Sequence, residues 1–364
     1  MKIKPTIVIS SYDSLGHPVY SGGGAVAVHE VAKRLLSHYQ VMVLSGRYPT
    51  SKDRKIDGIH YKYIGSWLGP QISQLVFQMC LPYYVTSLKF DLWIESFTPP
   101  FSTALLPLFT KKPIVGWLHM LCGPDMKRKY FLPFDLIEQH GLKIYNFLIT
   151  TSETLKTKVK AYNPKAIIKV VPNGVNFTKP TLSAKAKHIL YLGRIEVNQK
   201  GLDLLLEAYK KISLHIQYPL VIAGTGSETE LKKLQRLIKK LELTDKVLLA
   251  GRVVGEKKAE LIQNAVCMVT PSRYETFSLV ALEALAAGIP LVSFDIEGLS
   301  WIPKNSHLTA KSFDVKDFSR KMQKVIEDKN LRKTLKANAN KFSKQYSWDS
   351  SADQIYQTVK GSMV

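Results

Sequence analysis

Cysteine is scarce in this sequence, and the common metal and nucleotide motifs are missing. The 364 residues include three cysteines, odd in number and far apart, so neither a disulfide framework nor a metal site is expected. This pattern is typical of a reducing, cytoplasmic environment. No G-x-G-x-x-G and no G-x-x-x-x-G-K-[ST] occurs. A nicotinamide oxidoreductase and a P-loop ATPase therefore lose their main support.

Long hydrophobic runs are missing as well. The first residues, MKIKPTIVISSYDSLG, hold only a short apolar run, which is too short for the core of a signal peptide. No uninterrupted run of 18 or more apolar residues occurs, so a membrane-spanning helix is not expected. Residues 66–88 lack charge entirely, but Pro70, Pro82 and three glutamines favour a buried helix. Contact of this segment with a membrane surface is the alternative.

Acidic residues are few relative to basic ones. There are 51 Lys and Arg against 29 Asp and Glu, a net charge of +22, and residues 1–173 and 174–364 carry +11 each. The excess predicts attraction to a polyanion: nucleic acid, an anionic membrane surface or a phosphorylated small molecule. No motif of RNA or DNA recognition supports the first of these.

Short apolar runs alternate with helical patterns along both halves of the chain. Near-continuous apolar strands separated by helices are typical of a parallel sheet covered on both faces, so two doubly wound α/β domains are expected. Between them, residues 174–187 show no periodicity and predict a linker. In such sheets ligands bind beyond the carboxyl ends of the strands. The predicted strands lie within 6–11, 40–46, 58–65, 91–96, 113–119, 146–152 and 167–174, then 188–194, 219–224, 246–252, 266–272 and 289–295.

Three strand-to-helix loops carry glycine or basic residues. Gly22, Gly23 and Gly24 precede the first predicted helix, where free backbone N–H groups bind anions, although a flexible turn explains a glycine triplet equally well. Arg194 and Lys200 flank the loop after the strand at 188–194 and could neutralise a diphosphate, or form a solvated surface pair. Gly224 follows the next strand, which is a weak signal alone.

The stretch SRYETFSLVALEALAAGIPLV, residues 272–292, contains two glutamates separated by seven residues. The helix is expected to start near Phe277 or Ser278, so Glu275 lies in the loop before it and Glu283 lies inside it. Backbone N–H groups of Ser278, Leu279 and Val280 then fall in the first turn, where a phosphate is favoured. An unpaired buried carboxylate among alanines and leucines is costly, so Glu283 either faces solvent or has a specific hydrogen-bonding partner.

The ordered set of motifs resembles the retaining glycosyltransferases of family four, which have the GT-B two-domain fold. The resemblance covers nearly the whole chain and rests on the glycines at 22–24, VPNGVN, GRIEVNQKG, ETFSLVALE and FSKQYSWDSSADQIY. It implies domains at 1–173 (acceptor side) and 174–345 (nucleotide sugar), with a helix at 346–364 returning to the first domain. The sequence departs from the family at IEGLSWI, where a second glycine is frequent, and at Phe277-Ser278, where Gly-Phe-Gly is frequent. Both departures leave the donor open.

The resemblance also implies roles for individual residues. Glu283 would bind the ribose hydroxyls of the donor, and Glu275 the hydroxyls of the transferred sugar. Arg194 and Lys200 would hold the diphosphate in place of a metal, in keeping with the absence of any D-x-D. His119, the last residue of the stretch PIVGWLH (113–119), matches the family's active-site histidine. The remaining donor-binding positions are Gly23, Gly24, Gly224, Arg252, Phe277, Ser278, Leu279 and Val280.

The implied reaction is metal-free, retaining transfer of a hexose-type sugar from a nucleotide-diphosphate sugar. No cofactor is expected, and a UDP-sugar is favoured over a GDP-sugar. The acceptor would be a hydroxyl of a glycan, a lipid-linked sugar or a cell-envelope sugar. We expect a cytoplasmic enzyme, peripheral on the inner face of the cytoplasmic membrane. The basic segment at 122–134 could dock on anionic lipid headgroups or contact a charged acceptor, although an exposed basic loop without a partner explains it equally well. A nucleotide-sugar epimerase and a non-catalytic partner subunit are the alternatives.

Overall fold

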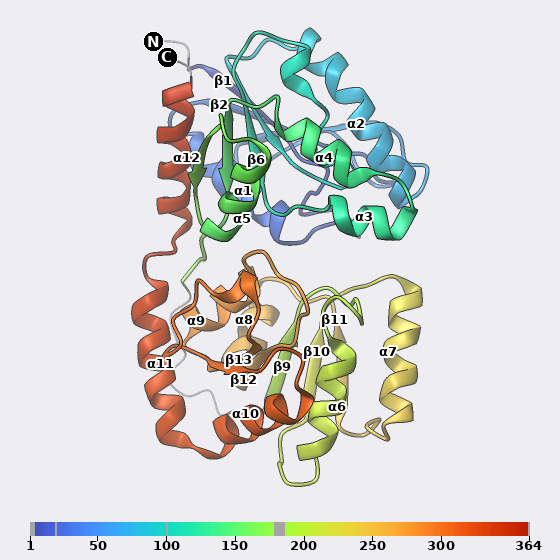
Figure 1. Ribbon diagram of the computed structural model, residues 1–364, viewed down its shortest axis with the longest axis vertical. Coiled ribbons are helices and arrows are strands. Elements are labelled where there is room, and N and C mark those ends of the chain that lie inside the picture. The colour runs from blue at the N-terminus through green and yellow to red at the C-terminus, as the bar shows by residue number, and fades with distance from the viewer. Residues whose placement is uncertain (1–3, 19, 100, 178–185, 363–364) are drawn as a thin grey trace. The chain divides into compact units, whose positions relative to one another are not determined.

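The computed structural model describes residues 4–18, 20–99, 101–177 and 186–362. The chain divides into two compact units (Figure 1). The first unit comprises Met1–Gly174 and Trp348–Val364, and the second comprises Val175–Ser347. These limits lie one and two residues from those predicted from the sequence. The predicted linker at 174–187 lies largely outside the described residues.

The first unit is built on an eight-stranded sheet with the order β3-β4-β2-β1-β5-β6-β7-β8. All neighbours are parallel except β3 and β4, which form an antiparallel pair that the sequence analysis missed. The chain order reverses between β1 and β5, which pair from Ile7 with Leu92 to Ser10 with Glu95. The strands are β1 Thr6–Ser10, β2 Gln40–Gly46, β3 Arg54–Ile56, β4 Ile59–Ile64, β5 Leu92–Ser96, β6 Ile114–Leu118, β7 Phe147–Thr150 and β8 Ile167–Val170.

Helices cover this sheet, and the last helix of the chain is one of them. It packs on the first helix through Arg34, whose Nε donates to Asp349 at 2.5 Å, and through stacked rings of His38 and Tyr356 with centroids 4.3 Å apart. The helices are α1 Gly23–Leu35, α2 Pro70–Ser87, α3 Gly123–Tyr130, α4 Phe134–Leu142, α5 Glu153–Tyr162 and α12 Trp348–Ser362, with the 3-10 turn η1 Leu106–Leu108.

The second unit has a fully parallel six-stranded sheet with the order β11-β10-β9-β12-β13-β14. The chain order reverses between β9 and β12, so this pair forms the topological switch point of the sheet. The strands are β9 His188–Leu192, β10 Leu220–Ala223, β11 Val247–Gly251, β12 Ala265–Thr270, β13 Leu291–Phe294 and β14 Leu308–Ala310. The prediction of two parallel-sheet α/β domains is confirmed.

The helices of the second unit show why amphipathic segments fold where they do. In α7 the buried residues Leu234 and Ile238 lie one turn apart, while the other face is basic. At its start Ser227 Oγ accepts from Glu230 N, and the Glu230 carboxylate accepts from Val197 N at 2.6 Å. The helices are α6 Leu202–Ile212, α7 Glu228–Lys240, α8 Gly255–Gln263, α9 Leu279–Ala287, α10 Val315–Glu327 and α11 Lys329–Ser343, with the 3-10 turn η2 Glu297–Leu299.

Helix α2 corresponds to the uncharged segment and is only half buried. Phe77, Leu81 and Val85 pack into the core of the first unit, whereas Met79 and Tyr83 are 70% and 68% exposed. The expectation of a buried helix is therefore wrong for its outer face. Among the described residues, no helix combines the length and apolar character needed to cross a bilayer.

Candidate functional site

Loops at the carboxyl ends of β9 and β12 meet at the switch point of the second unit. The side chain of Lys200, after β9, donates to Glu275 Oε1 at 2.7 Å, and Glu275 follows β12. Ser272 Oγ donates to the same oxygen, also at 2.7 Å. The Lys200 and Glu275 side chains are 18% and 12% exposed. The structure thus brings together two predicted site residues that lie 75 positions apart in the chain.

A close backbone approach at Gly201 and the side chain of Arg273 hold these two loops together. A Cβ added at Gly201 would overlap the carbonyl oxygen of Pro271, so the close approach requires glycine there. Arg273 donates twice to Asp203, each time at 2.8 Å, and once to the carbonyl of Asn198 at 2.6 Å. Such a bidentate pair fixes geometry as well as charge. Arg273 was not predicted, although it lies inside the stretch that carried the glutamates.

The turn before α9 is held in a left-handed conformation. Ser278 has φ +63° and caps the helix, because its Oγ accepts from Ala281 N at 3.3 Å. Phe277 stacks on Trp301 with ring centroids 4.5 Å apart, and Trp301 Nε1 donates to the Phe277 carbonyl at 2.7 Å. The first-turn N–H groups of Leu279 and Val280 are consequently presented at a rigid helix start.

Glu283 has a partner within the protein that the sequence did not predict. Lys258 on α8 donates to Glu283 Oε1 at 2.5 Å, and the two side chains are 32% and 21% exposed. Within the described residues, the buried Oε2 of Glu283 has no hydrogen-bond partner. One oxygen is thus paired with Lys258, and the other is buried without a hydrogen-bond partner among the described residues. Lys258 was missed because its segment shows only helical periodicity.

The other predicted residues of this unit are more exposed. Arg194 pairs with Glu196 at 2.9 Å and Gln199 at 2.7 Å, with its side chain 53% exposed, so the structure does not place it on the Lys200–Glu275 pair. Gly224 packs so closely on the preceding loop that a Cβ there would overlap the carbonyl of Gly193. Arg252 follows β11 and is exposed.

The single glycine in IEGLSWI also has a structural reason. A Cβ added at Gly298 would overlap the carbonyl oxygen of Glu275. The η2 turn therefore supports the loop that carries the catalytic candidate. The sequence analysis noted Gly298 as a departure from the family without foreseeing this contact.

In the first unit, three predicted residues lie together at the carboxyl edge of the sheet. Gly23 and Gly24 begin α1, and a Cβ added at Gly24 would lie 3.8 Å from His119 Cδ2 and 3.7 Å from Asp13 Oδ2. His119 packs on Trp117 with ring centroids 4.6 Å apart. Burial lowers the pKa of His119 to about 4, so the imidazole is neutral at neutral pH. Its Nε2 is buried and has no partner in the described part of the chain.

Two buried carboxylates hold loops of the first unit in place. Glu138 accepts from the backbone N–H groups of Cys122 and Gly123, at 2.8 and 3.1 Å, just after β6. Glu95 accepts from Ala104 N at 2.5 Å and from the Tyr145 hydroxyl. Burial raises the pKa of Glu95 to about 7. Neither glutamate was predicted, because an isolated acid in an apolar stretch carries no motif.

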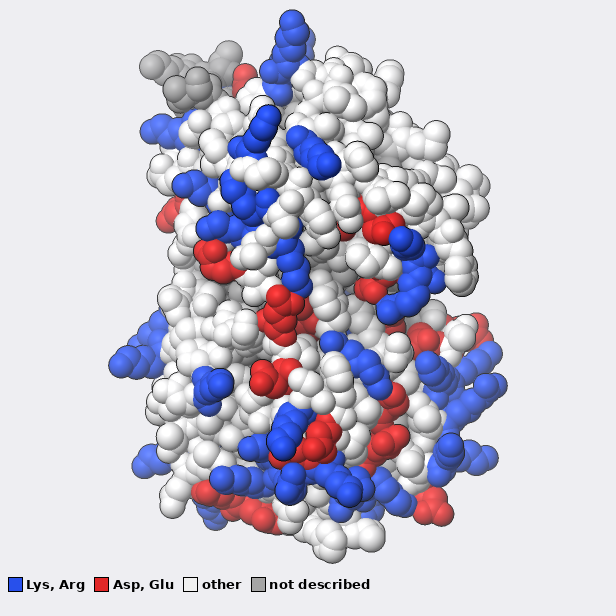
Figure 2. All heavy atoms as spheres, viewed as in Figure 1, with Lys and Arg blue, Asp and Glu red and all other residues white. Residues whose placement is uncertain are grey.

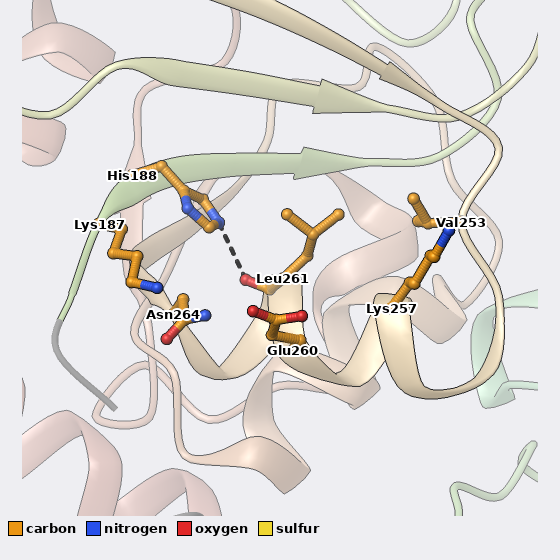
Figure 3. Close-up of a pocket in the computed structure, with 7 residues that line it drawn as sticks. All are labelled: Lys187, His188, Val253, Lys257, Glu260, Leu261 and Asn264. Carbon is orange, nitrogen blue, oxygen red and sulfur yellow. Dashed lines mark hydrogen bonds between the residues drawn. The ribbon is translucent and has the colours of Figure 1, made fainter. Parts of the chain in front are cut away.

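A pocket of about 380 Å³ lies beside α8, at His188, Lys257 and Glu260 (Figure 3). His188 Nε2 lies 2.9 Å from the Leu261 carbonyl, and burial lowers its pKa. None of the predicted site residues lines this pocket. Among the described residues, no group of three or more His, Cys, Asp or Glu is arranged to hold a metal ion.

Comparisons with known proteins match both units. A family model described as glycosyl transferases group 1 matches residues 175–342, and one described as glycosyltransferase family 4 matches residues 21–179. The uncharacterized glycosyltransferase MJ1178 of Methanocaldococcus jannaschii is 30% identical over 252 residues, which cover 68% of this chain and 68% of that protein. The matched stretches span 59% to 68% of the length of three such relatives.

Solved structures share the fold over the whole chain. The sucrose-phosphate synthase of Thermosynechococcus elongatus has a TM-score of 0.86 at 20% identity, covering 98% of this chain and 99% of that one. Anabaena HepE, solved in complex with UDP-glucose, has a TM-score of 0.76 at 18% identity, covering 98% and 100%. The chain therefore belongs to the glycosyltransferases of group 1, family 4, with two Rossmann-like domains of the GT-B type.

Proposed function

We propose that this glycosyltransferase moves a hexose-type sugar, with retention, from a nucleotide-diphosphate sugar to a hydroxyl acceptor without a metal. The observation that carries the proposal is the Lys200–Glu275 pair at the switch point between β9 and β12. A cation and a carboxylate, both largely buried and close to a rigid helix start, suit a ligand that joins phosphates to sugar hydroxyls.

The donor would bind along the second unit. Lys200 and the first-turn N–H groups of Leu279 and Val280 would hold the diphosphate, and Glu283 Oε2 would accept a ribose hydroxyl. Arg194 is exposed enough to swing from Glu196 to a phosphate. Gly224, Arg252, Phe277 and Ser278 would line the same edge, since they follow β10, β11 and β12. We favour a UDP-sugar over a GDP-sugar, with no cofactor.

Electrostatic stabilisation would drive the chemistry. As the bond between the anomeric carbon and the phosphate oxygen breaks, its electron pair passes to the diphosphate, whose charge Lys200 and the helix start offset. The acceptor hydroxyl attacks from the face of the leaving group, and its proton passes to the departing phosphate oxygen. Neutral His119 and the N-terminus of α1 at Gly23 and Gly24 would bind the transferred sugar and the acceptor.

The proposed acceptor is a hydroxyl of a glycan, a lipid-linked sugar or a cell-envelope sugar. The proposed location of the protein is the cytoplasm, on the inner face of the cytoplasmic membrane. The net charge of +22 supports an anionic surface as the partner. We propose no nucleic-acid partner.

Nucleotide release tests the proposal. Purified protein would be incubated with UDP-, GDP- and ADP-sugars in the presence of EDTA. We expect slow hydrolysis of one donor that Glu275→Gln abolishes and that Glu242→Gln leaves intact, because Glu242 is an exposed acid paired with Lys210 on the same unit. An altered sugar still joined to its nucleotide would instead indicate an epimerase. Failure of every donor to bind or react would refute the proposal.

A further inference from the structure

The outer face of α2 carries apolar side chains that the protein does not cover. Ile72, Leu75, Met79 and Tyr83 follow one another at helical spacing and are 52%, 37%, 70% and 68% exposed. The core residues Phe77, Leu81 and Val85 occupy the opposite side of the same helix. These four outer residues are called the α2 face. A continuous apolar row of this kind marks an interaction site, whereas single exposed apolar residues do not.

Neighbouring elements extend the α2 face. The 3-10 turn η1 packs against α2 and ends in Leu108 and Phe109, which are 64% and 47% exposed. Leu68, just before α2, is 61% exposed. Figure 2 shows an uncharged surface over α2 and α4, with charged side chains gathered over α3. The exposed apolar side chains therefore extend beyond α2 itself.

Within the two segments that supply α2 and η1, the charged residues have one sign. Residues 58–90 and 96–124, which supply α2 and η1, contain no Asp or Glu, but each contains two lysines. Lys89 and Lys111 are exposed, and Lys112 Nζ lies 4.6 Å from the centroid of the Phe90 ring, three residues beyond the end of α2. Lysine is depleted at protein–protein interfaces, whereas apolar side chains flanked by lysine suit an anionic bilayer surface.

We propose that the α2 face lies on an anionic lipid bilayer, with Met79 and Tyr83 entering the boundary between headgroups and acyl chains and the flanking lysines contacting headgroups. This inference rests on the proposed function only in that a lipid-linked acceptor would give the bilayer contact its purpose. Binding to the bilayer itself requires no sugar transfer. It gives the proposed membrane association a definite surface, which differs from residues 122–134, the basic segment that the sequence favoured. The prediction of a loop there is wrong, because residues 123–130 form helix α3, on which Lys127 and Arg128 are paired with Asp135 and Asp125.

Flotation of the full-length protein with lipid vesicles tests this. At physiological salt we expect the protein to float with vesicles that contain phosphatidylglycerol and not with pure phosphatidylcholine. Met79→Glu should weaken partitioning about tenfold, because it withdraws one large apolar side chain from the bilayer. Lys89→Gln combined with Lys111→Gln should weaken it for anionic vesicles. Leu214→Glu is the matched control, since Leu214 is 80% exposed on the second unit.

Three results would overturn the inference. These are no flotation of the unaltered protein, equal flotation of Met79→Glu and the unaltered protein, or a dimer in sedimentation that Met79→Glu dissociates, which would make a second copy the occupant. Nucleotide release measured on the same preparations separates the two proposals. Lipid-dependent flotation without donor turnover would refute the proposed function alone, and turnover without flotation would refute the membrane surface alone.

Discussion

Lys258→Met removes the cation that holds Glu283 while keeping most of the side-chain volume. In the structure Lys258 Nζ lies 2.5 Å from Glu283 Oε1, and Leu282, Ala284 and Leu285 around the carboxylate are buried. Removing one partner of a fully buried pair costs about 3–5 kcal/mol, and an exposed pair contributes about 0–1 kcal/mol. Since Lys258 is 32% exposed, we expect a loss of about 1–2 kcal/mol in the free energy of unfolding.

The same change should weaken nucleotide binding. In the proposed donor complex Lys258 would hold the Glu283 carboxylate so that Oε2 accepts a ribose hydroxyl, and a carboxylate without this partner would rotate or draw in water. We expect the Kd for the nucleoside diphosphate to rise about tenfold, with KM rising more than kcat falls. Titration calorimetry and urea denaturation measure the two effects.

A matched control lies on the same helix. Lys257 faces the pocket of Figure 3 and does not touch Glu283 in the structure, so Lys257→Met should change neither quantity. In a double-mutant cycle with Glu283→Gln, the combined loss of stability should be smaller than the sum of the single losses by about 1 kcal/mol. Unchanged affinity in Lys258→Met, or equal losses in Lys257→Met, would refute the reasoning.

Three further changes test the supporting structure. Ser278→Gly should shift the free energy of unfolding by less than about 1 kcal/mol, because relief at φ +63° offsets the lost cap, whereas Ser278→Val should lose about 2 kcal/mol or more in urea denaturation. Gly298→Ala should lower the rate of nucleotide release from the donor at least about tenfold, because the added Cβ displaces the Glu275 carbonyl. A release rate equal to that of the unaltered protein would contradict this. The pKa of Glu95 is raised to about 7, above its usual 4.5, so its contribution to stability is present below pH 4.5 and lost as pH rises through 7. Unfolding at pH 5 and 8 should therefore show a fall of about 3 kcal/mol that Glu95→Gln removes.

Local pattern was sufficient for the fold and for part of the site. Apolar runs identified the strands, because parallel strands buried on both faces are almost continuously apolar. The expected start of α9 near Ser278 placed Glu275 in the loop before the helix and Glu283 inside it. The antiparallel strand β3 was missed, because Arg54–Ile56 is short and largely polar and depends on its pairing with β4.

Partners across the fold were not predictable. Lys258 shows only helical periodicity, and nothing local connects it with a glutamate 25 residues away. Arg194 was expected beside Lys200, but its long side chain reaches Glu196 and Gln199 in its own loop. The buried partners of Glu95 and Glu138 come from three separate loops, so burial and hydrogen bonds appear only after the chain has packed.

The sequence by itself determined the α/β class, the two-domain organisation and the family. It also indicated that most of the candidate site residues lie in the loops that follow the strands. These follow from periodicity and from motifs whose members lie close together in the chain. Tertiary structure alone decided which charges pair, that Glu283 keeps one oxygen free, and that the outer face of α2 stays uncovered. The physical reason is that burial and side-chain pairing depend on contacts between distant segments, and periodicity reports only which face of a segment is apolar.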